Sequence, residues 1–307
     1  MNRNYKYPAF SLQTLFLCLF LLFSGIAPGF AQADIENIPL AFQRSLYGFS
    51  FAKAISILND FEKSNAGAER VNELKSQLSW WMILSGNNIQ LNIDKCNKYL
   101  AESINDYKKI KNPDIDIQIK LINAYLLKLR IENYLDNKIN SLSILHKLLK
   151  RVDDLDNIKE KDLSIKLISG LYYYFLEYIK SEYVLSHVIL AGYTKGNKEL
   201  GLRYLEECSN SNDDIIMTEA IYFLYKIYFS IEKNYPEAEK QITILLNLYP
   251  ENLVFALEYY KVLLAQNQLI KAKEFKKITI DKIYGSTLLY EQQKSHFLKL
   301  LEGYKPD

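Results

Sequence analysis

The chain has 307 residues, of which 49% are hydrophobic and 24% are charged. These proportions are ordinary for a folded globular protein, so they exclude a wholly disordered chain and a low-complexity polymer. Residues 1–33 hold two basic residues and no acidic one, which leaves 36 basic and 36 acidic residues in 34–307. A neutral chain has no overall electrostatic attraction to nucleic acid or to an anionic membrane surface.

Residues 1–33 have the three parts of a secretory signal peptide. Arg3 and Lys6 precede an apolar run from Leu15 to Phe23, and Ala31-Gln32-Ala33 supplies the small residues of a cleavage site. The apolar run is much shorter than the roughly 20 residues of a membrane-spanning helix. We therefore expect cleavage near Ala33, export to the periplasm or envelope, and no transmembrane span in the mature chain.

Helical spacing of apolar residues continues through the rest of the chain. Ala54, Leu58 and Phe61 fall on one helical face, and Ala238, Ile242 and Leu245 fall on another. Short polar breaks separate such runs, among them 86–88, 111–114, 195–197 and 210–214. Strand-like alternation is absent from the sequence. The pattern predicts about twelve helices of roughly 10–22 residues, paired as antiparallel hairpins because short loops make consecutive helices neighbours.

Two copies of a pattern follow each other at a spacing of 34 residues between Ala220 and Ile278. The matching pairs are Tyr225 with Tyr259, Phe229 with Leu263, Tyr235 with Leu269, and Ala238 with Ala272. The stretch 235–238, followed by Ile242, Leu245 and Pro250, resembles a tetratricopeptide repeat. The resemblance is closer over 219–252 than over 253–283, where Lys276 replaces an apolar residue and no proline ends the repeat.

The resemblance implies an all-α fold. We expect residues 34–307 to form a single domain, an α-solenoid of antiparallel helix hairpins wound as a right-handed superhelix. A helix pair cannot bury its own apolar stripe, so stacked pairs share one core.

The family's groove positions imply a function in binding. In tetratricopeptide repeats, outward residues of the first helix of each pair line a concave surface that holds a peptide or a partner's helix. The corresponding positions here are Phe223, Ile227, Ser230, Leu257 and Lys261. The leading prediction is a non-enzymatic exported scaffold for protein–protein interaction in the bacterial envelope, with a protein or peptide partner and any peripheral membrane association made through that partner.

Two alternatives remain open from the sequence. One is a glycan-binding component associated with the outer membrane, in which Trp80 and Trp81 stack on a sugar ring. Adjacent residues of a helix point in different directions, so normally one of the two faces the core. The other alternative is an all-helical cell-wall enzyme, which requires a catalytic glutamate in a separate lobe that the sequence does not suggest.

Residues suited to catalysis or metal binding are sparse. His146, His187 and His296 are far apart in the sequence, and none has a second ligand three or four positions away. No glycine-rich phosphate loop is present. The sequence therefore predicts no catalytic residue, no metal and no cofactor. Cys96 and Cys208 lie on apolar stripes, which predicts buried thiols, with a disulfide between them as the alternative.

Overall fold

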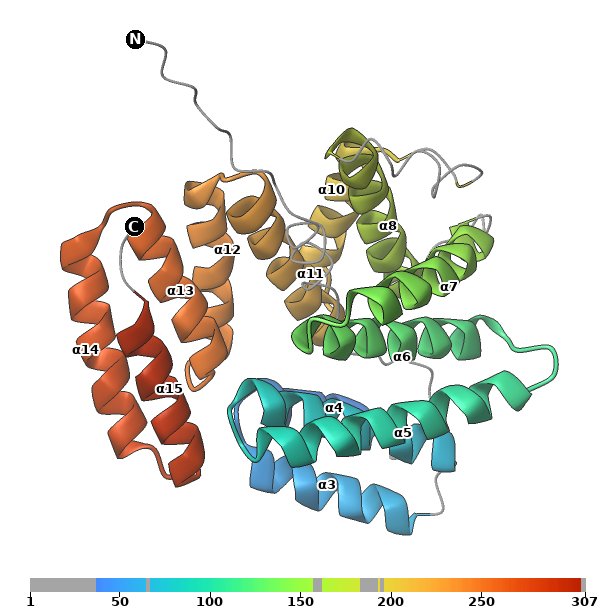
Figure 1. Cartoon of the computed structure of the whole chain (residues 1–307), viewed down its shortest axis with the longest axis horizontal. Helices are drawn as coiled ribbons and strands as arrows, with labels where there is room; N and C mark the ends of the chain where they lie inside the picture. The colour runs from blue at the N-terminus through green and yellow to red at the C-terminus, as the bar shows by residue number, and fades with distance from the viewer. Residues whose placement is uncertain (1–36, 65–66, 157–161, 183–192, 194–195, 305–307) are drawn as a thin grey trace.

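The fold was analysed in a computed structural model that describes residues 37–64, 67–156, 162–182, 193 and 196–304 (Figure 1). The predicted signal peptide and His187 lie outside these residues. The described part is helical and contains no strand, which confirms the all-α class. The first helices are α2 (Asn37–Tyr47), α3 (Phe51–Lys63), α4 (Ala68–Leu84), α5 (Ile89–Lys109), α6 (Ile115–Tyr134), α7 (Lys138–Asp156) and α8 (Leu163–Glu182). They are followed by α10 (Lys198–Ser209), α11 (Asp214–Lys226), η1 (Ile227–Ile231), α12 (Tyr235–Leu248), α13 (Leu253–Ala265), α14 (Leu269–Gly285) and α15 (Glu291–Gly303).

Side-chain caps begin several of these helices. Asp114, Asp213 and Asn252 accept hydrogen bonds from backbone N–H groups in the first turns of α6, α11 and α13. These N–H groups have no partner inside the helix, so a side-chain oxygen stabilises the helix start. The breaks at 86–88 and 111–114 lie between helices as predicted, with Asn88 and Asn112 at φ values of 39° and 53°. Asparagine tolerates this left-handed conformation better than most residues.

A π-helical turn, η1, continues α11 directly after Lys226. It spans Ile227–Ile231, and its wider winding is seen in the hydrogen bond from the Glu232 N–H to the carbonyl of Ile227, 3.0 Å long. Such turns change the direction in which the following side chains point, and they recur near functional sites.

Consecutive helices pack on each other along the chain. Helices α8 and α10 approach each other closely at a point where two glycines, Gly170 and Gly201, face each other. A Cβ atom at Gly201 would lie 2.7 Å from the carbonyl oxygen of Gly170 and 2.7 Å from the backbone nitrogen of Tyr174. The two backbones can therefore come this close only because position 201 has no side chain.

The row of helices also curves until its first members return to its last ones (Figure 1). The Gln293 side-chain amide of α15 donates to the Ser85 hydroxyl at the end of α4, with a donor–acceptor distance of 2.6 Å. The rings of Phe49 and Phe297 are 5.9 Å apart, centre to centre. One hydrophobic cluster combines residues of α2, α3 and α4 with residues of α11 to α15, and a second fills the space from α4 to α11.

Cys96 and Cys208 are both buried free thiols, so no disulfide joins them. The Cys96 thiol donates to the carbonyl of Ser76 over 3.1 Å. Burial raises the pKa of Cys208 to about 12 and also raises that of Cys96. Both side chains act as small apolar core groups. Within the described ranges, no helix combines the length and the apolar character needed to cross a bilayer.

Candidate functional site

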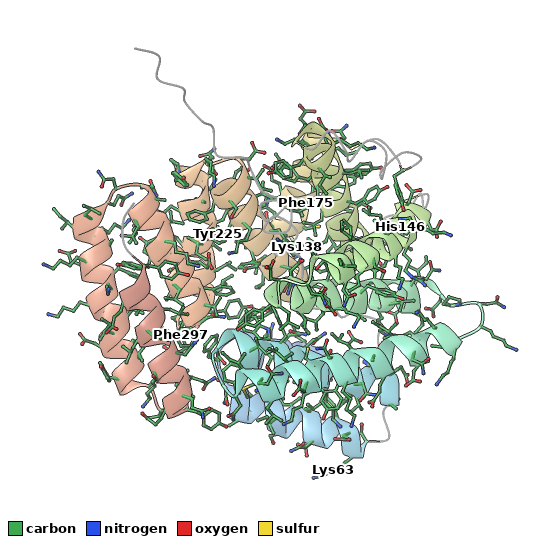
Figure 2. The ribbon with its side chains drawn as sticks, viewed as in Figure 1. Lys63, Lys138, His146, Phe175, Tyr225 and Phe297 are labelled. Atoms are coloured by element: carbon green, nitrogen blue, oxygen red, sulfur yellow. The ribbon has the colours of Figure 1, made fainter. Side chains whose placement is uncertain are left out.

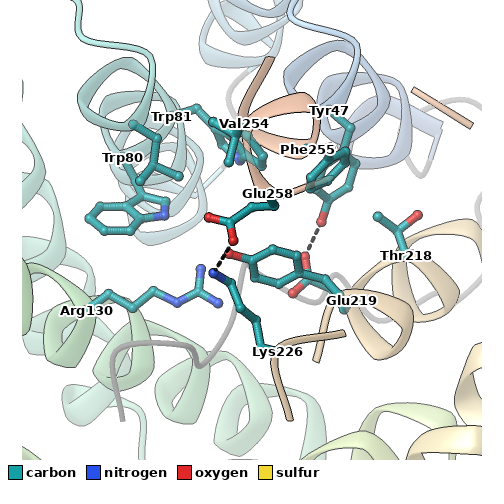
Figure 3. Close-up of a pocket in the computed structure, with 12 residues that line it drawn as sticks. Tyr47, Trp80, Trp81, Arg130, Thr218, Glu219, Lys226, Val254, Phe255 and Glu258 are labelled. Atoms are coloured by element: carbon teal, nitrogen blue, oxygen red, sulfur yellow. Dashed lines mark hydrogen bonds and ion pairs between the residues drawn. The ribbon is translucent and has the colours of Figure 1, made fainter. Parts of the chain in front are cut away.

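A pocket of about 110 Å³ lies where helices from distant parts of the sequence meet (Figure 3). Its walls come from α4, α6, α11 and α13, with a contribution from the end of α2. The lining residues are Tyr47, Trp80, Trp81, Leu84, Arg130, Thr218, Glu219, Tyr222, Lys226, Val254, Phe255 and Glu258. This space is several times what one water molecule needs, so a small ligand has room in it.

Glu258 of α13 organises the charged groups on one wall. Its Oε2 accepts hydrogen bonds from the Tyr225 hydroxyl at 2.5 Å and from Lys226 Nζ at 2.9 Å. Its Oε1 accepts from Lys261 Nζ at 3.0 Å. Burial alone would raise the pKa of this carboxyl, but the two lysines and the tyrosine hold it well below its ordinary value. Glu258 is therefore ionised at neutral pH, and both of its oxygens have partners.

A second pair of opposite charges faces the pocket from α6 and α11. Glu219 accepts a hydrogen bond from the Tyr47 hydroxyl. Burial lowers the pKa of Arg130 to about 10, while the nearby Glu219 raises it. Arg130 thus keeps its charge at neutral pH. Figure 3 shows its guanidinium pointing toward Lys226 and Glu258.

Aromatic side chains form much of the remaining wall. Trp80 and Trp81 of α4 are each 5% exposed, and they are the only two tryptophans of the chain. Trp80 meets the ring of Tyr134 edge-on at 6.2 Å, and Trp81 meets the ring of Tyr47 edge-on at 5.5 Å. The sequence indicated that one of the two tryptophans would face the core, yet both are buried and both border the pocket. The reason is that α4 is packed by α2 and α3 as well as by α5 and α6.

The residues that the sequence predicted for a binding groove do not line the pocket. Phe223, Ile227 and Leu257 are buried in the hydrophobic clusters, at 1%, 0% and 5% exposure. Ser230 is half-buried, within η1. Lys261 is also half-buried, and its hydrogen bond to Glu258 places it behind the pocket wall.

The walls are formed instead by the sequence neighbours of those residues. Tyr222, Lys226 and Glu258 face the pocket, each one position away from a predicted groove residue. One position along a helix is a rotation of about 100°. Helix α11 is buried on nearly all sides, so its apolar pattern does not reveal which side faces the interior. A usable signal was the presence of Glu219 and Lys226 in an otherwise apolar helix, because buried charges need partners.

The two described histidines lie outside the pocket. His146 is exposed and lies 3.1 Å from the Tyr193 hydroxyl. His296 packs against Gly86, where an added Cβ would be 2.2 Å from the imidazole. Within the described part of the chain, no group of three or more His, Cys, Asp or Glu residues is arranged to hold a metal ion. The chemistry that the pocket offers is hydrogen bonding, charge pairing and contact with aromatic rings.

Fold and pocket together define an all-helical protein with an internal site that is both aromatic and charged. Comparison of the chain with family models, with curated proteins and with solved structures finds no match.

Proposed function

We propose that the chain is a non-enzymatic binding protein that holds a small ligand, or one chemical group of a larger partner, in the pocket between α4, α6, α11 and α13. The observation that carries this proposal is the convergence of both tryptophans with four charged side chains on one pocket. Concave sites that combine apolar walls with a few placed polar groups are typical of ligand binding. Burying Arg130, Glu219, Lys226 and Glu258 has a desolvation cost, which a binding role would account for.

A small occupant suits this geometry better than an extended peptide. The curvature of the helix row brings α2 and α4 against α11 and α13, which narrows the inner face to a small, partly open pocket. A volume of about 110 Å³ accommodates a small organic molecule or a single side chain.

The proposal includes a tetratricopeptide-like α-solenoid as the architecture of residues 34–307. The pairs α11–α12 and α13–α14 support it, because each pair packs together and repeats at the spacing seen in the sequence. Ala238 and Ala272, at matching positions of the two second helices, are both buried, at 0% and 2% exposure. A small residue there allows the paired helices to approach closely.

Export to the periplasm or envelope is part of the same proposal and has a direct test. Mass spectrometry of the protein isolated from its own source should find an N-terminus at Asp34. Recovery of the intact segment 1–33 on the mature protein would contradict export by cleavage near Ala33.

Intrinsic fluorescence gives a specific test of the pocket. Since Trp80 and Trp81 are the only tryptophans and both line the pocket, emission excited at about 295 nm reports on this site alone. We expect a saturable change when the mature chain is titrated with members of a panel of small acids, amines, neutral amides and monosaccharides. Sugars belong in the panel because the two tryptophans also suit the glycan-binding alternative.

A matched pair of variants tests whether the change in tryptophan emission comes from binding in the pocket. Val254→Asp places a charge on the pocket wall and should abolish the change. Val262→Ala lies on the same helix but in the core, with 0% exposure, and should lower stability while leaving the change intact. If no compound in the panel alters the emission, the proposed function is wrong.

The protein–protein scaffold is the second candidate function, and a surface feature of α14 favours it. Ile270, Ile278 and Tyr284 of this helix are 80%, 64% and 66% exposed. Lys273 and Lys277 lie between them and are also exposed. Such a face suits a partner protein that presents apolar residues bordered by acidic ones.

The protein–protein scaffold function is tested with a partner protein. This partner is first captured with the mature chain as bait and is then purified. Binding should be lost in the double variant Ile270→Glu, Ile278→Glu. It should persist in Ile139→Glu, whose parent side chain is 82% exposed on α7. If both variants bind the partner equally well, α14 is not the docking face.

A further inference from the structure

The outward side of α14 is left uncovered by the rest of the described chain. The three buried residues of this helix share its inner side, and the helix packs on α13 and α15. The opposite side carries Ile270 and Tyr284, which are 80% and 66% exposed. Figure 1 shows α14 at the outer edge of the row of helices. Large apolar side chains that are exposed on one face of a helix mark an interaction surface.

The charged residues on this side of α14 are arranged by sign. Successive residues of a helix are rotated by about 100°, so Lys273 and Lys277 lie on one side of a line drawn along the helix through Ile270. Glu274 and Asp281 lie on the other side of that line. All four charged residues are exposed. The helix therefore has a basic edge, Lys273 and Lys277, and an acidic edge, Glu274 and Asp281, with Ile270 between them.

Other lysines of α14 are already paired within the chain. Lys271 Nζ lies 2.6 Å from Glu239 Oε1, and Lys282 Nζ lies 3.1 Å from Glu251 Oε1. The four residues of the basic and acidic edges make no ion pair with any residue that the structure describes. Their charges are available to a partner and sum to zero. A nucleic acid or an anionic membrane would be repelled by the acidic edge, so the face suits a partner that also carries both signs.

A second copy of the chain supplies the complement of this face. When two copies of a helix pack in parallel about a twofold axis, the axis exchanges left and right but keeps the height along the helix. Lys273 of one copy then faces Glu274 of the second copy. Lys277 faces the side on which Asp281 lies about 6 Å further along, within reach of a lysine side chain. Each contact occurs twice, and Ile270 meets its own copy at the axis.

An antiparallel pairing of the same two helices is disfavoured. A twofold axis that runs across the helices reverses the height but keeps left and right, so each basic edge would face the basic edge of the second copy. The two acidic edges would face each other in the same way. Like charges placed opposite each other across an interface cost free energy. The arrangement of charge on α14 therefore selects the parallel pairing.

We propose that the outward side of α14 is the interface of a homodimer, in which the α14 helices of two copies pack in parallel about a twofold axis. This inference rests on the scaffold function, the second candidate above, and names a second copy of the chain as the partner of α14. One helix face buries less than the roughly 800 Å² per partner of a standard interface. The dissociation constant should therefore lie in the micromolar range, at about 1–100 μM.

Charge reversal tests the pairing of the two edges. The variant Lys273→Glu, Lys277→Glu makes the whole face acidic, and the variant Glu274→Lys, Asp281→Lys makes it basic. Sedimentation of the mature chain over a range of concentrations should show a dimer of the parent. Each variant alone should associate at least about tenfold more weakly, because like charges then meet across the axis. An equimolar mixture of the two variants should dimerise at least as tightly as the parent.

A matched control keeps the charge change but moves it to another helix. Lys147 and Lys150 are exposed on α7, and Lys147→Glu, Lys150→Glu should leave the dimer unchanged. Exposed substitutions of this kind have little effect on folding. Circular dichroism should therefore show parent-like helix content and thermal unfolding for all three double variants.

A cysteine at position 270 tests the orientation of the helices. In the parallel dimer Ile270→Cys lies at the axis beside its own copy, so mild oxidation with copper phenanthroline should link two chains by a disulfide. In an antiparallel dimer the two cysteines would be about 20 Å apart, too far for a disulfide. Cys96 and Cys208 are buried, so the parent should stay unlinked. Ile139→Cys, at an exposed position of α7, is the control and should also stay unlinked.

The outcomes separate the dimer from the scaffold function. A parent chain that is monomeric at every concentration would overturn the dimer, while loss of a different partner in the double variant Ile270→Glu, Ile278→Glu would still support the scaffold. A dimer that neither charge reversal weakens, or that the mixture of variants does not restore, would overturn the pairing of the two edges. Restoration by the mixture without a disulfide at position 270 would overturn the parallel arrangement.

Discussion

Asn252 and Tyr47 are 205 positions apart, yet the Asn252 side-chain amide donates to the Tyr47 backbone carbonyl over 2.9 Å. The same side chain caps α13 through its oxygen, which accepts from the N–H groups of Val254 and Phe255. Asn252 is completely buried. One residue therefore begins a helix on the pocket wall and fastens it to the first described helix.

Replacing Asn252 by alanine should cost more than the loss of an ordinary cap. The cap is worth about 1 kcal/mol, and the buried Tyr47 carbonyl that loses its donor adds about 1–3 kcal/mol. Asn197→Ala is the matched control, because Asn197 caps α10 through a 2.8 Å bond to the Leu200 N–H at an exposed position. Urea unfolding followed by circular dichroism measures both variants, and equal losses would contradict the dual role.

Gly86 should not tolerate alanine. It has a φ of 78°, and an added Cβ would lie 2.2 Å from the His296 ring of α15. We expect Gly86→Ala to lower the free energy of unfolding by about 1–3 kcal/mol, through backbone strain and the clash together. Gly303→Ala, which has open space around the new methyl group, should change little.

A double variant separates the two causes at Gly86. Gly86→Ala combined with His296→Ala relieves the clash but not the strain, so it should recover part of the loss seen in the single variant. If the effects of the two substitutions on the free energy of unfolding simply add, positions 86 and 296 are not coupled. That result would mean that α15 does not pack on the end of α4.

The crossing of α8 and α10 depends on Gly201. An alanine methyl group there would meet backbone atoms of Gly170 and Tyr174 at 2.7 Å, and backbone cannot swing aside as a flexible side chain can. We expect Gly201→Ala to destabilise the fold by about 2 kcal/mol or more, measured by thermal and urea unfolding. Gly285→Ala, near which no atom lies within 4 Å, is the control.

The ion pairs of Glu258 with Lys226 and Lys261 should make the stability of the fold depend on pH in the acidic range. The folded-state pKa of Glu258 lies below its ordinary value of 4.5, despite the opposing effect of burial. Its stabilising contribution is therefore present above about pH 4.5 and is lost as the pH falls below that value. Glu258→Gln leaves two lysines without their buried partner, and it should cost about 3–5 kcal/mol at pH 7.

Unfolding measured at pH 7 and at pH 3 tests this dependence. The difference between the parent chain and Glu258→Gln should shrink at pH 3, whereas the exposed change Glu274→Gln should have little effect at either pH. A difference for Glu258→Gln that stays the same at both pH values would mean that the carboxyl is not held ionised by its neighbours.

Much of the local structure follows from the sequence alone. Apolar residues such as Ala54, Leu58 and Phe61 recur at helical spacing, and all three are buried on one face of α3. The polar breaks at 86–88 and 111–114 separate helices, because asparagine and proline favour turns over continued helix. The helical class was predictable because helix periodicity and loop chemistry are local properties.

The pocket is not a local property, and no short stretch of sequence contains it. Trp80, Arg130, Glu219 and Glu258 belong to four different helices, and only the curvature of the helix row brings them together. Periodicity identifies the exposed side of a helix when one side is polar. Helix α11 is apolar nearly all round, so its pattern cannot tell whether Tyr222 or Phe223 faces the interior, and only the charges of Glu219 and Lys226 indicated buried partners.

The sequence by itself determined that the described chain is built of helices and where several of the breaks between them fall. The tertiary structure decided which helices meet across the interior and which residues of α11 and α13 face it. The physical reason is one of range: capping and periodicity act within a few residues, whereas a buried ion pair or an inter-helix hydrogen bond depends on how far the whole row of helices curves.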